Sequence, residues 1–137
     1  MPKNYTRSSV SNKRDIETRD DLLQLMQLFY RKLLADPGIS YLFTDVAKIN
    51  LEEHLPVLVD FWDGILFGSD TYRKNAMQPH LGLHAASPLT VEHFETWLRY
   101  FKGSVDELFE GEKAFLTKER ATGIATVMRI KISQLSQ

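Results

Sequence analysis

Four histidines are the residues of this chain best suited to bind a metal, and His80 has the most informative surroundings. It follows Pro79 in the stretch 72–83, which has no apolar periodicity of its own and therefore needs another group to hold it. A neutral imidazole on such a segment, between helices rich in aromatic residues, is suited to ligate a haem iron. Most histidines are surface groups or hydrogen-bonded core residues, so this interpretation needs support from the neighbouring residues. His84, one helical turn further on, is the second candidate ligand.

Three side chains with hydrogen-bonding tips lie within apolar stripes of separate predicted helices: Tyr30, His54 and Trp97. A buried tyrosine hydroxyl or indole N–H requires a hydrogen-bond partner. Dioxygen on ferrous iron carries partial negative charge and would be a suitable acceptor. Each residue also has a simpler interpretation, because an aromatic residue on an inner helical face is commonly part of the core, and His54 could be solvated. The convergence of the three favours a ligand pocket.

Helical periodicity predicts four long helices joined by short pieces, with no internal repeat and no convincing strand. The long helices are expected at 18–36, 50–68, 90–111 and 112–135. Residues of the types that cap helix N termini open the first three of them: Thr18, Asn50 and Thr90. The chain is therefore predicted to form an all-α domain.

Two shorter pieces and one proline complete the predicted chain path. We expect a tight turn at 39–43 and at most one short helix within 72–88, because proline and glycine interrupt that region. Pro56 has no backbone N–H, so its helix either begins close to this residue or kinks there. Either arrangement would loosen the backbone near His54 and make its side chain a candidate gate.

The three-and-four spacing of apolar residues predicts which side chains face the core. In the helix at 90–111 these are Phe94, Trp97, Leu98, Phe101, Val105 and Leu108. In the last helix they are Phe115, Leu116, Ile124, Val127, Met128, Ile130 and Leu135.

Length and composition limit the possible classes of protein. A chain of 137 residues forms one domain, its formal charge of -1 offers no basic field for nucleic acid, and its lack of cysteine excludes disulfides and iron–sulfur clusters. The apolar run 55–67 contains acidic residues and is too short to span a bilayer. Residues 1–17 are polar and basic, unlike a secretory signal. We expect a cytoplasmic protein with a flexible tail at 1–17 and one domain at 18–137, without nucleic-acid or membrane partners.

Together these motifs resemble those of the group III truncated haemoglobins, over about residues 18–135. The spacing before that family's proximal histidine matches the spacing before His80, with Tyr72, Asn75 and Met77. Three further segments resemble the family's distal side: 29–30, 54–62 and 94–98. The resemblance implies a truncated globin fold, in which two helices pack over two in a sandwich around haem b.

The resemblance also implies roles for individual residues. His80 would be the proximal ligand of the iron, and the distal side would present Tyr30, His54 and Trp97. Contacts that line the haem are implied for Phe43, Leu58, Phe61, Trp62, Tyr72, Met77, Leu81, Leu83 and Trp97. The cations placed to pair with the haem propionates are Arg73, Lys74 and Arg99.

The function expected from these residues is binding of dioxygen, nitric oxide or carbon monoxide, with dioxygen held tightly. The alternative is a haem enzyme that detoxifies nitric oxide or peroxide, in which tryptophan and tyrosine side chains pass oxidising equivalents outward. Because the chain contains no flavin or nicotinamide domain, turnover would need a separate reductase. A third possibility is a haem-free helical interaction module, in which Trp62 and Trp97 are only core residues.

Overall fold

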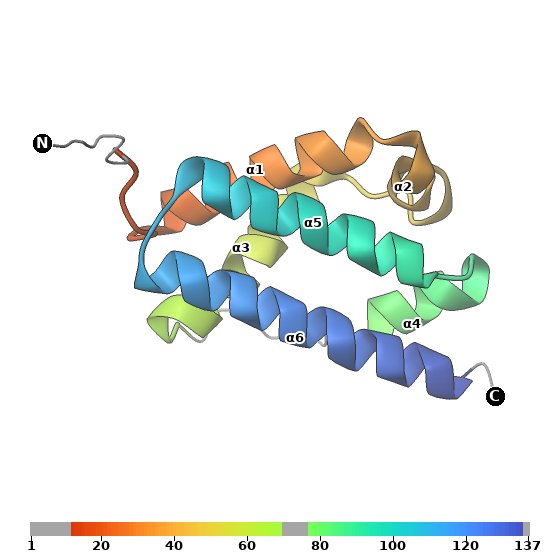
Figure 1. Cartoon of the computed structure of the whole chain (residues 1–137). Coiled ribbons are helices and arrows are strands. Elements are labelled where there is room, and N and C mark those ends of the chain that lie inside the picture. Colours follow the sequence, from red (N-terminus) through yellow and green to blue (C-terminus); the bar gives the residue numbers. More distant parts are fainter. Residues whose placement is uncertain (1–11, 70–76, 136–137) are drawn as a thin grey trace, which may run out of the picture.

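The computed structural model describes residues 12–69 and 77–135, and these form an all-α domain without a strand (Figure 1). The predicted fold class is confirmed. Seven helical elements follow one another: α1 (Arg19–Leu34), α2 (Pro37–Tyr41), a π-helical turn η1 (Leu42–Val46), α3 (Leu51–Phe67), α4 (Met77–Ala86), α5 (Val91–Leu108) and α6 (Glu112–Leu135). Among the described residues, no helix has the length and apolar character needed to cross a membrane.

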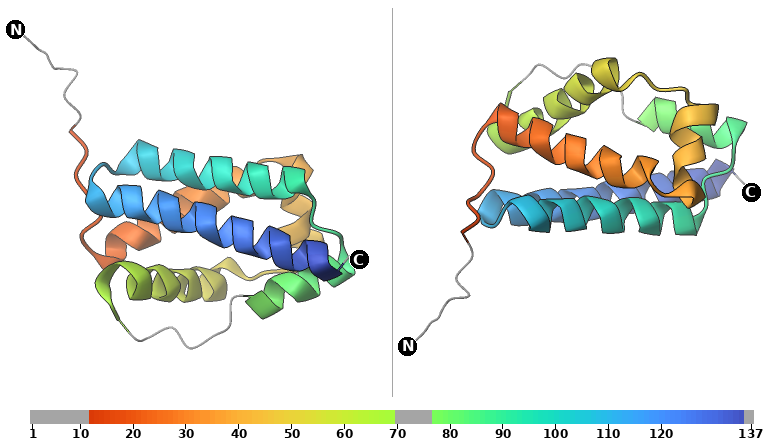
Figure 2. Two further views of the ribbon diagram at one scale, coloured as in Figure 1. Left: turned by 60° about the horizontal axis from the view of Figure 1, so that its bottom comes forward. Right: turned by 90° about the horizontal axis from the view of Figure 1, so that it is seen from above.

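The long helices form two antiparallel pairs stacked on each other, as the two views of Figure 2 show. The pair α1 and α3 makes one layer, and the pair α5 and α6 makes the other. Helix α1 contacts both α3 and α5, so it joins the two layers. The short helix α4 lies against α6 and η1. This is the predicted sandwich of two helices over two.

Side-chain caps begin the helices where the sequence predicted them. The side chains of Thr18 and Thr90 each accept a hydrogen bond from the backbone N–H three residues further on. In both cases the side chain of that third helical residue accepts a hydrogen bond from the backbone N–H of the threonine. Asn50 caps α3 by accepting from the backbone N–H of Glu53. These bonds satisfy N–H groups that a helix start leaves without partners.

The tight turn predicted at 39–43 is wrong, because this segment is helical. Asp36 accepts a hydrogen bond from the backbone N–H of Gly38 at 2.9 Å and so caps α2, with Pro37 in the first helical position. The second carboxylate oxygen of Asp36 accepts from the Tyr100 hydroxyl at 2.6 Å, which ties α2 to α5. Asp36 and Pro37 therefore begin a new helix, because aspartate can cap a helix N terminus and proline is favoured in the first helical position.

Helix α3 runs through Pro56 without a break. It begins at Leu51, five positions earlier, and continues to Phe67, where Gly68 closes it with a φ of 74°. Because Pro56 cannot donate to the carbonyl of Glu52, one backbone bond of the first turns is absent. His54 lies within this weakened stretch, one turn after the cap.

Part of the predicted flexible tail is packed, which corrects the expectation for residues 12–17. The Ile16 side chain is buried in the core, and the Asp15 carboxylate accepts bonds from the backbone N–H groups of Lys113 and Ala114 at 2.9 and 2.8 Å. Gly111 permits this approach, because a Cβ there would lie 2.5 Å from the Asp15 Cγ atom. The segment therefore links α1 to the start of α6. Residues 1–11 lie outside the described residues.

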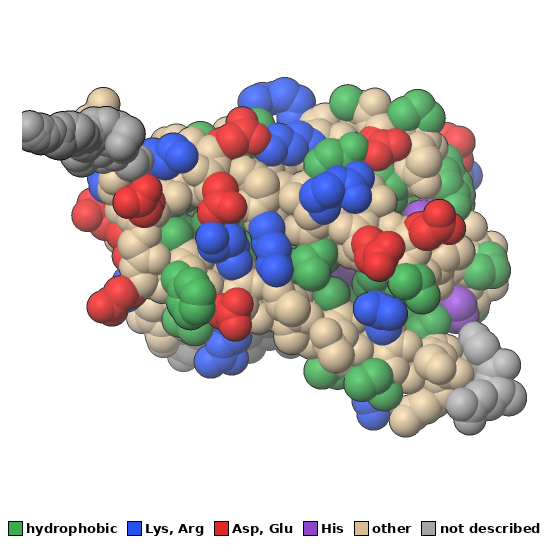
Figure 3. Space-filling view, viewed as in Figure 1, with side chains coloured by type: hydrophobic (Ala, Val, Ile, Leu, Met, Phe, Trp, Pro, Cys, Tyr) green, Lys and Arg blue, Asp and Glu red, His purple; other side chains and the backbone are tan. Residues whose placement is uncertain are grey.

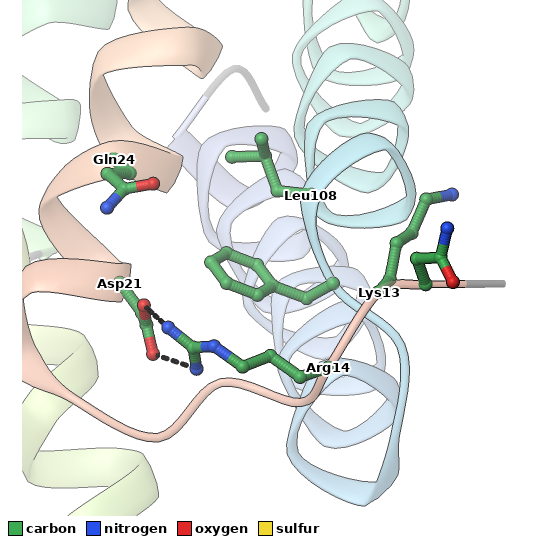
Figure 4. A pocket seen from close by; sticks show the side chains of 7 residues that line it. Lys13, Arg14, Asp21, Gln24 and Leu108 are labelled. Atoms are coloured by element: carbon green, nitrogen blue, oxygen red, sulfur yellow. Dashed lines mark hydrogen bonds and ion pairs between the residues drawn. The ribbon is translucent and has the colours of Figure 1, made fainter.

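An ion pair holds the same segment against α1. Arg14 donates two hydrogen bonds to the Asp21 carboxylate, at 2.7 and 2.5 Å (Figure 4). Asp21 is 1% exposed and also accepts from the backbone N–H groups of Glu17 and Thr18. The bonds from Arg14, together with those from the backbone, lower the pKa of Asp21 from 3.8 to about 2. The hollow beside this pair, of about 740 Å³, lies at the opposite end of α1 from Tyr30.

The Asp21 carboxylate is expected to make the unfolding free energy depend on pH. Its pKa is lower in the folded protein, so its stabilisation is complete above about pH 5 and is lost as pH falls through 4 towards 2. A difference of roughly two pKa units corresponds to about 2–3 kcal/mol. In Asp21→Asn this part of the acid dependence should be missing from urea unfolding curves followed by circular dichroism. The neighbouring variant Asp20→Asn, at an exposed position, should keep it. Parallel acid profiles for wild type and Asp21→Asn would contradict the assignment.

The inward face predicted for the last helix is largely wrong. Ile124 and Met128 face inward, but Phe115, Leu116, Val127, Ile130 and Leu135 are between 37% and 62% exposed. The residues that α6 buries are Ala114, Thr117, Ala121, Ala125, Met128 and Ile132. Small side chains predominate in this set, and they allow α6 to lie close to α5. On the face of the molecule seen in Figure 3, hydrophobic side chains lie singly among charged ones.

Candidate functional site

Helices α1 and α3 bring Tyr30 and His54 into direct contact. The Tyr30 hydroxyl lies 2.8 Å from the His54 Nε2 atom, and the two rings meet edge to face with centroids 5.4 Å apart. Tyr30 is 5% exposed, and this burial raises its pKa above the ordinary value, so the phenol keeps its proton at neutral pH. Phe43 from η1 covers the other side of the Tyr30 ring, at 5.5 Å. The structure thus contains a hydrogen bond between a buried tyrosine and a half-buried histidine, both of which were predicted to be distal residues.

Trp97 lies close to this pair but is not bonded to it. The ring of Phe29 contacts both Tyr30 and Trp97 edge to face, with centroid distances of 5.4 and 5.7 Å. The Trp97 side chain is half-buried, and its indole N–H donates no hydrogen bond to any residue that the structure describes. A donor in this condition is available to a bound molecule. Of the three side chains predicted to converge, Tyr30 and His54 are therefore in contact, and the Phe29 ring lies between Tyr30 and Trp97.

Two of the four histidines are engaged by the backbone through Nδ1. The His84 Nδ1 atom accepts from the N–H of Leu89 at 2.9 Å, and the His93 Nδ1 atom accepts from the N–H of Thr90 at 3.0 Å. A neutral imidazole that accepts at Nδ1 carries its proton on Nε2, a tautomer inferred here from the hydrogen bonds. His93 Nε2 also lies 3.0 Å from the Tyr41 hydroxyl. Neither ring offers a lone pair to a metal while it makes these bonds.

This pattern distinguishes the two candidate proximal ligands. His84 would have to release the Leu89 N–H, which follows the end of α4, before it could coordinate iron. His80 lies in the first turn of the same helix and is half-buried. The backbone bonding of His84 disfavours it as a ligand, and the proximal role of His80 stays a prediction.

A stack of aromatic rings, which the sequence did not predict, extends from Trp97 into the core. Trp97 and Phe101 are one helical turn apart on α5, and their rings are nearly parallel, at 9° with centroids 5.6 Å apart. Trp62 from α3 stacks on Phe101 at 5.2 Å and 23°. The three-and-four spacing predicted Phe101 only as a core residue, because spacing within one helix says nothing of the partner from another.

The model for the bacterial-like globin family matches residues 15–133, nearly the whole of the described part. This chain belongs to the bacterial-like globins. It is 29% identical over 111 residues to the group 3 truncated haemoglobin ctb of Campylobacter jejuni, which covers 79% of this chain and 85% of that relative. It is also similar to the crystal structure of the group III truncated haemoglobin from that organism. There the TM-score is 0.78 at 25% identity, over 88% of this chain and 94% of the other. The predicted family resemblance is confirmed.

Membership of this family implies a protein that binds gas molecules at a haem, and the described residues of the globin fit such a group. Of the side chains predicted to line it, five are half-buried against the core: Phe43, Leu58, Phe61, Leu83 and Trp97. Leu81 on α4 is half-buried as well, whereas Trp62 is only 4% exposed and leaves little of its surface open to a ligand. The apolar side chains provide the wall that a flat, mostly apolar ligand needs. The Tyr30 hydroxyl, the His54 ring and the Trp97 N–H are the polar groups that would contact such a ligand.

Several predicted contacts of the globin lie outside the described residues. These are Tyr72, Arg73, Lys74 and Asn75, together with the side chain of Met77. Among the predicted propionate partners only Arg99 can be placed, and its guanidinium lies 5.2 Å from the centroid of the Tyr100 ring. These roles stay predictions.

Proposed function

We propose that this globin binds haem b through His80 and takes dioxygen, nitric oxide or carbon monoxide on the face occupied by Tyr30, His54 and Trp97. The observation that carries the proposal is the hydrogen bond between the buried Tyr30 and the half-buried His54, beside an indole N–H without a partner among the described residues. An ordinary core would gain more from apolar side chains at these positions, because unpaired buried donors are costly.

When bound, haem would supply an iron atom with one position open to a diatomic ligand. The protein's part is to provide hydrogen-bond donors that are already in place. If His54 carries its proton on Nε2, it donates to the Tyr30 oxygen, and the Tyr30 O–H is then directed elsewhere. Because burial raises the Tyr30 pKa, this proton is retained and can be donated to a partly anionic ligand. The Trp97 N–H is the second donor.

These donors support tight binding of dioxygen. A hydrogen bond to a charged acceptor contributes about 1.5–3 kcal/mol, and each 1.4 kcal/mol is roughly a factor of ten. Two such bonds would slow the release of dioxygen by about a hundredfold or more. Carbon monoxide carries less charge and would gain less. Slow release suits sensing or chemistry better than delivery.

The proposal is tested by visible absorption spectra of the purified protein supplied with haem. Spectra are recorded for the oxidised protein, after dithionite reduction, and after addition of carbon monoxide. We expect a Soret band that shifts and sharpens with carbon monoxide. If no Soret band forms after haem is supplied, the haem-free helical module is the correct interpretation and the residue roles above are withdrawn.

A haem enzyme is the second candidate function, and the stack of Trp97, Phe101 and Trp62 favours it. A protein that only binds a ligand has no need for two readily oxidised side chains, Trp97 and Trp62, that stack on the same ring. Such an enzyme would act on nitric oxide or peroxide and would need a separate electron donor.

A further inference from the structure

The aromatic stack connects the predicted distal side with the opposite layer of the fold. Trp97 and Phe101 belong to α5, whereas Trp62 belongs to α3, so the three rings cross from one helical layer to the other. Phe101 is 0% exposed, and neighbouring centroids are 5.2–5.6 Å apart. Both tryptophans of the chain are therefore in contact with the same buried ring.

Trp62 has chemical features that packing alone does not require. It is 4% exposed, and its indole N–H has no hydrogen-bond partner in the part of the chain that the structure describes. Buried donors are seldom left unpaired, and a phenylalanine would fill an apolar site without this cost. Indole is, with phenol, the most readily oxidised of the aromatic side chains. Burial would also protect an oxidised indole from reagents in solution.

We propose that the stack of Trp97, Phe101 and Trp62 carries one oxidising equivalent from the haem to Trp62, with Phe101 as the bridge. The proposal rests on the proposed function, because the equivalent originates at the haem. Phenylalanine is much harder to oxidise than tryptophan, so Phe101 couples the two indoles but does not hold the charge. Trp62 is the end of the route because Trp62 and Trp97 are the two tryptophans of the chain, and Trp97 is the one at the start of the route.

The oxidant is a peroxide. Breaking the O–O bond of hydrogen peroxide and forming two water molecules consumes two electrons and two protons. Bound haem would supply one of these electrons, Trp62 would supply the other through Phe101 and Trp97, and solvent would provide the protons. Since the Trp62 N–H donates no hydrogen bond to any described residue, the oxidised Trp62 keeps this proton and is a cation radical. Two one-electron donations from a small phenolic donor in solution would then restore Trp62 and the haem.

The test is electron paramagnetic resonance of haem-loaded protein frozen quickly after one equivalent of hydrogen peroxide. Tryptophan with a deuterated ring identifies the signal. We expect a tryptophan radical that falls at least about tenfold in Trp62→Phe and in Phe101→Leu. A radical that resides on tyrosine, Tyr30 above all, would overturn the proposal. So would a tryptophan radical that keeps its yield in Trp62→Phe.

Mass mapping of the wild-type protein gives a second measurement that needs no variant. After peroxide treatment the peptide containing Trp62 should gain oxygen only when haem is present, although this side chain is buried. Equal oxidation with and without haem, or none in either case, would overturn the proposal even if Trp62→Phe fails to fold.

A matched control separates the relay from general damage to the core. Phe109 is a buried phenylalanine without a ring contact to the stack in the described structure, so Phe109→Leu should keep the radical yield. A radical lost equally in Phe109→Leu would contradict the relay. Absence of a Soret band overturns both this proposal and the proposed function. A normal Soret band and carbon monoxide shift without a Trp62 radical overturns the relay alone.

Discussion

In a His80→Ala variant the Soret band of the haem-loaded globin is expected to weaken and broaden, and added imidazole should restore it. Losing a partner that merely hydrogen-bonds a metal ligand weakens metal binding by about ten- to hundredfold, so losing the ligand itself should cost more than about a hundredfold. Titration of the purified variant with haem, with and without imidazole, measures the change. Imidazole rescue distinguishes a missing ligand from a misfolded protein.

His84→Ala is the matched control for this experiment, since both histidines lie on α4. The Nδ1 atom of His84 accepts from the Leu89 backbone, so removing this ring should leave haem binding nearly unchanged. Retention of full haem affinity in His80→Ala, together with its loss in His84→Ala, would move the proximal role to His84.

Replacing Tyr30 by phenylalanine is expected to speed dioxygen dissociation by about ten- to hundredfold, the effect of one charge-assisted hydrogen bond. The substitution removes only the hydroxyl and keeps the edge contacts of the ring with Phe29 and Phe43. Carbon monoxide dissociation should change much less, because that ligand carries little charge. Both rates can be measured by stopped-flow displacement from the reduced, haem-loaded protein.

Two further variants sharpen the Tyr30 experiment. Tyr41→Phe removes a hydroxyl that contacts His93, outside the distal pair, and should leave the dioxygen rate unchanged. His54→Ala removes the partner that orients Tyr30, so its effect should be smaller than that of Tyr30→Phe and should not add fully to it. An unchanged dioxygen rate in Tyr30→Phe would remove Tyr30 from the site.

The starts of the helices were predictable because their signals act within a single turn. Thr18, Asn50 and Thr90 each bond a backbone N–H only three residues away, so the residue types alone reveal the cap. The same local chemistry is present at Asp36–Pro37, where the sequence predicted the end of the first helix but not the start of α2. The resemblance to truncated globins depended on the spacing of a few residues, which needs no knowledge of packing.

The inward face of α6 could not be found in this way. Apolar residues occupy several sides of this helix, and its partners decide which side is covered. Close packing against α5 selects the side with Ala121 and Ala125 and leaves Phe115 exposed. Sequence periodicity assigns the large apolar side chains to the buried face, whereas close contact between two helices requires small side chains there.

Residue types and short spacings were enough to establish an all-α globin with a candidate proximal histidine, because capping, periodicity and motif spacing operate along the chain. Contacts between distant segments were decided only by the packed fold. These include the hydrogen bond between Tyr30 and His54, the bond from the Lys113 N–H to Asp15 and the stack that joins Trp97 to Trp62. Each depends on the distance and angle between two backbones, and those quantities are set by the burial of the whole core.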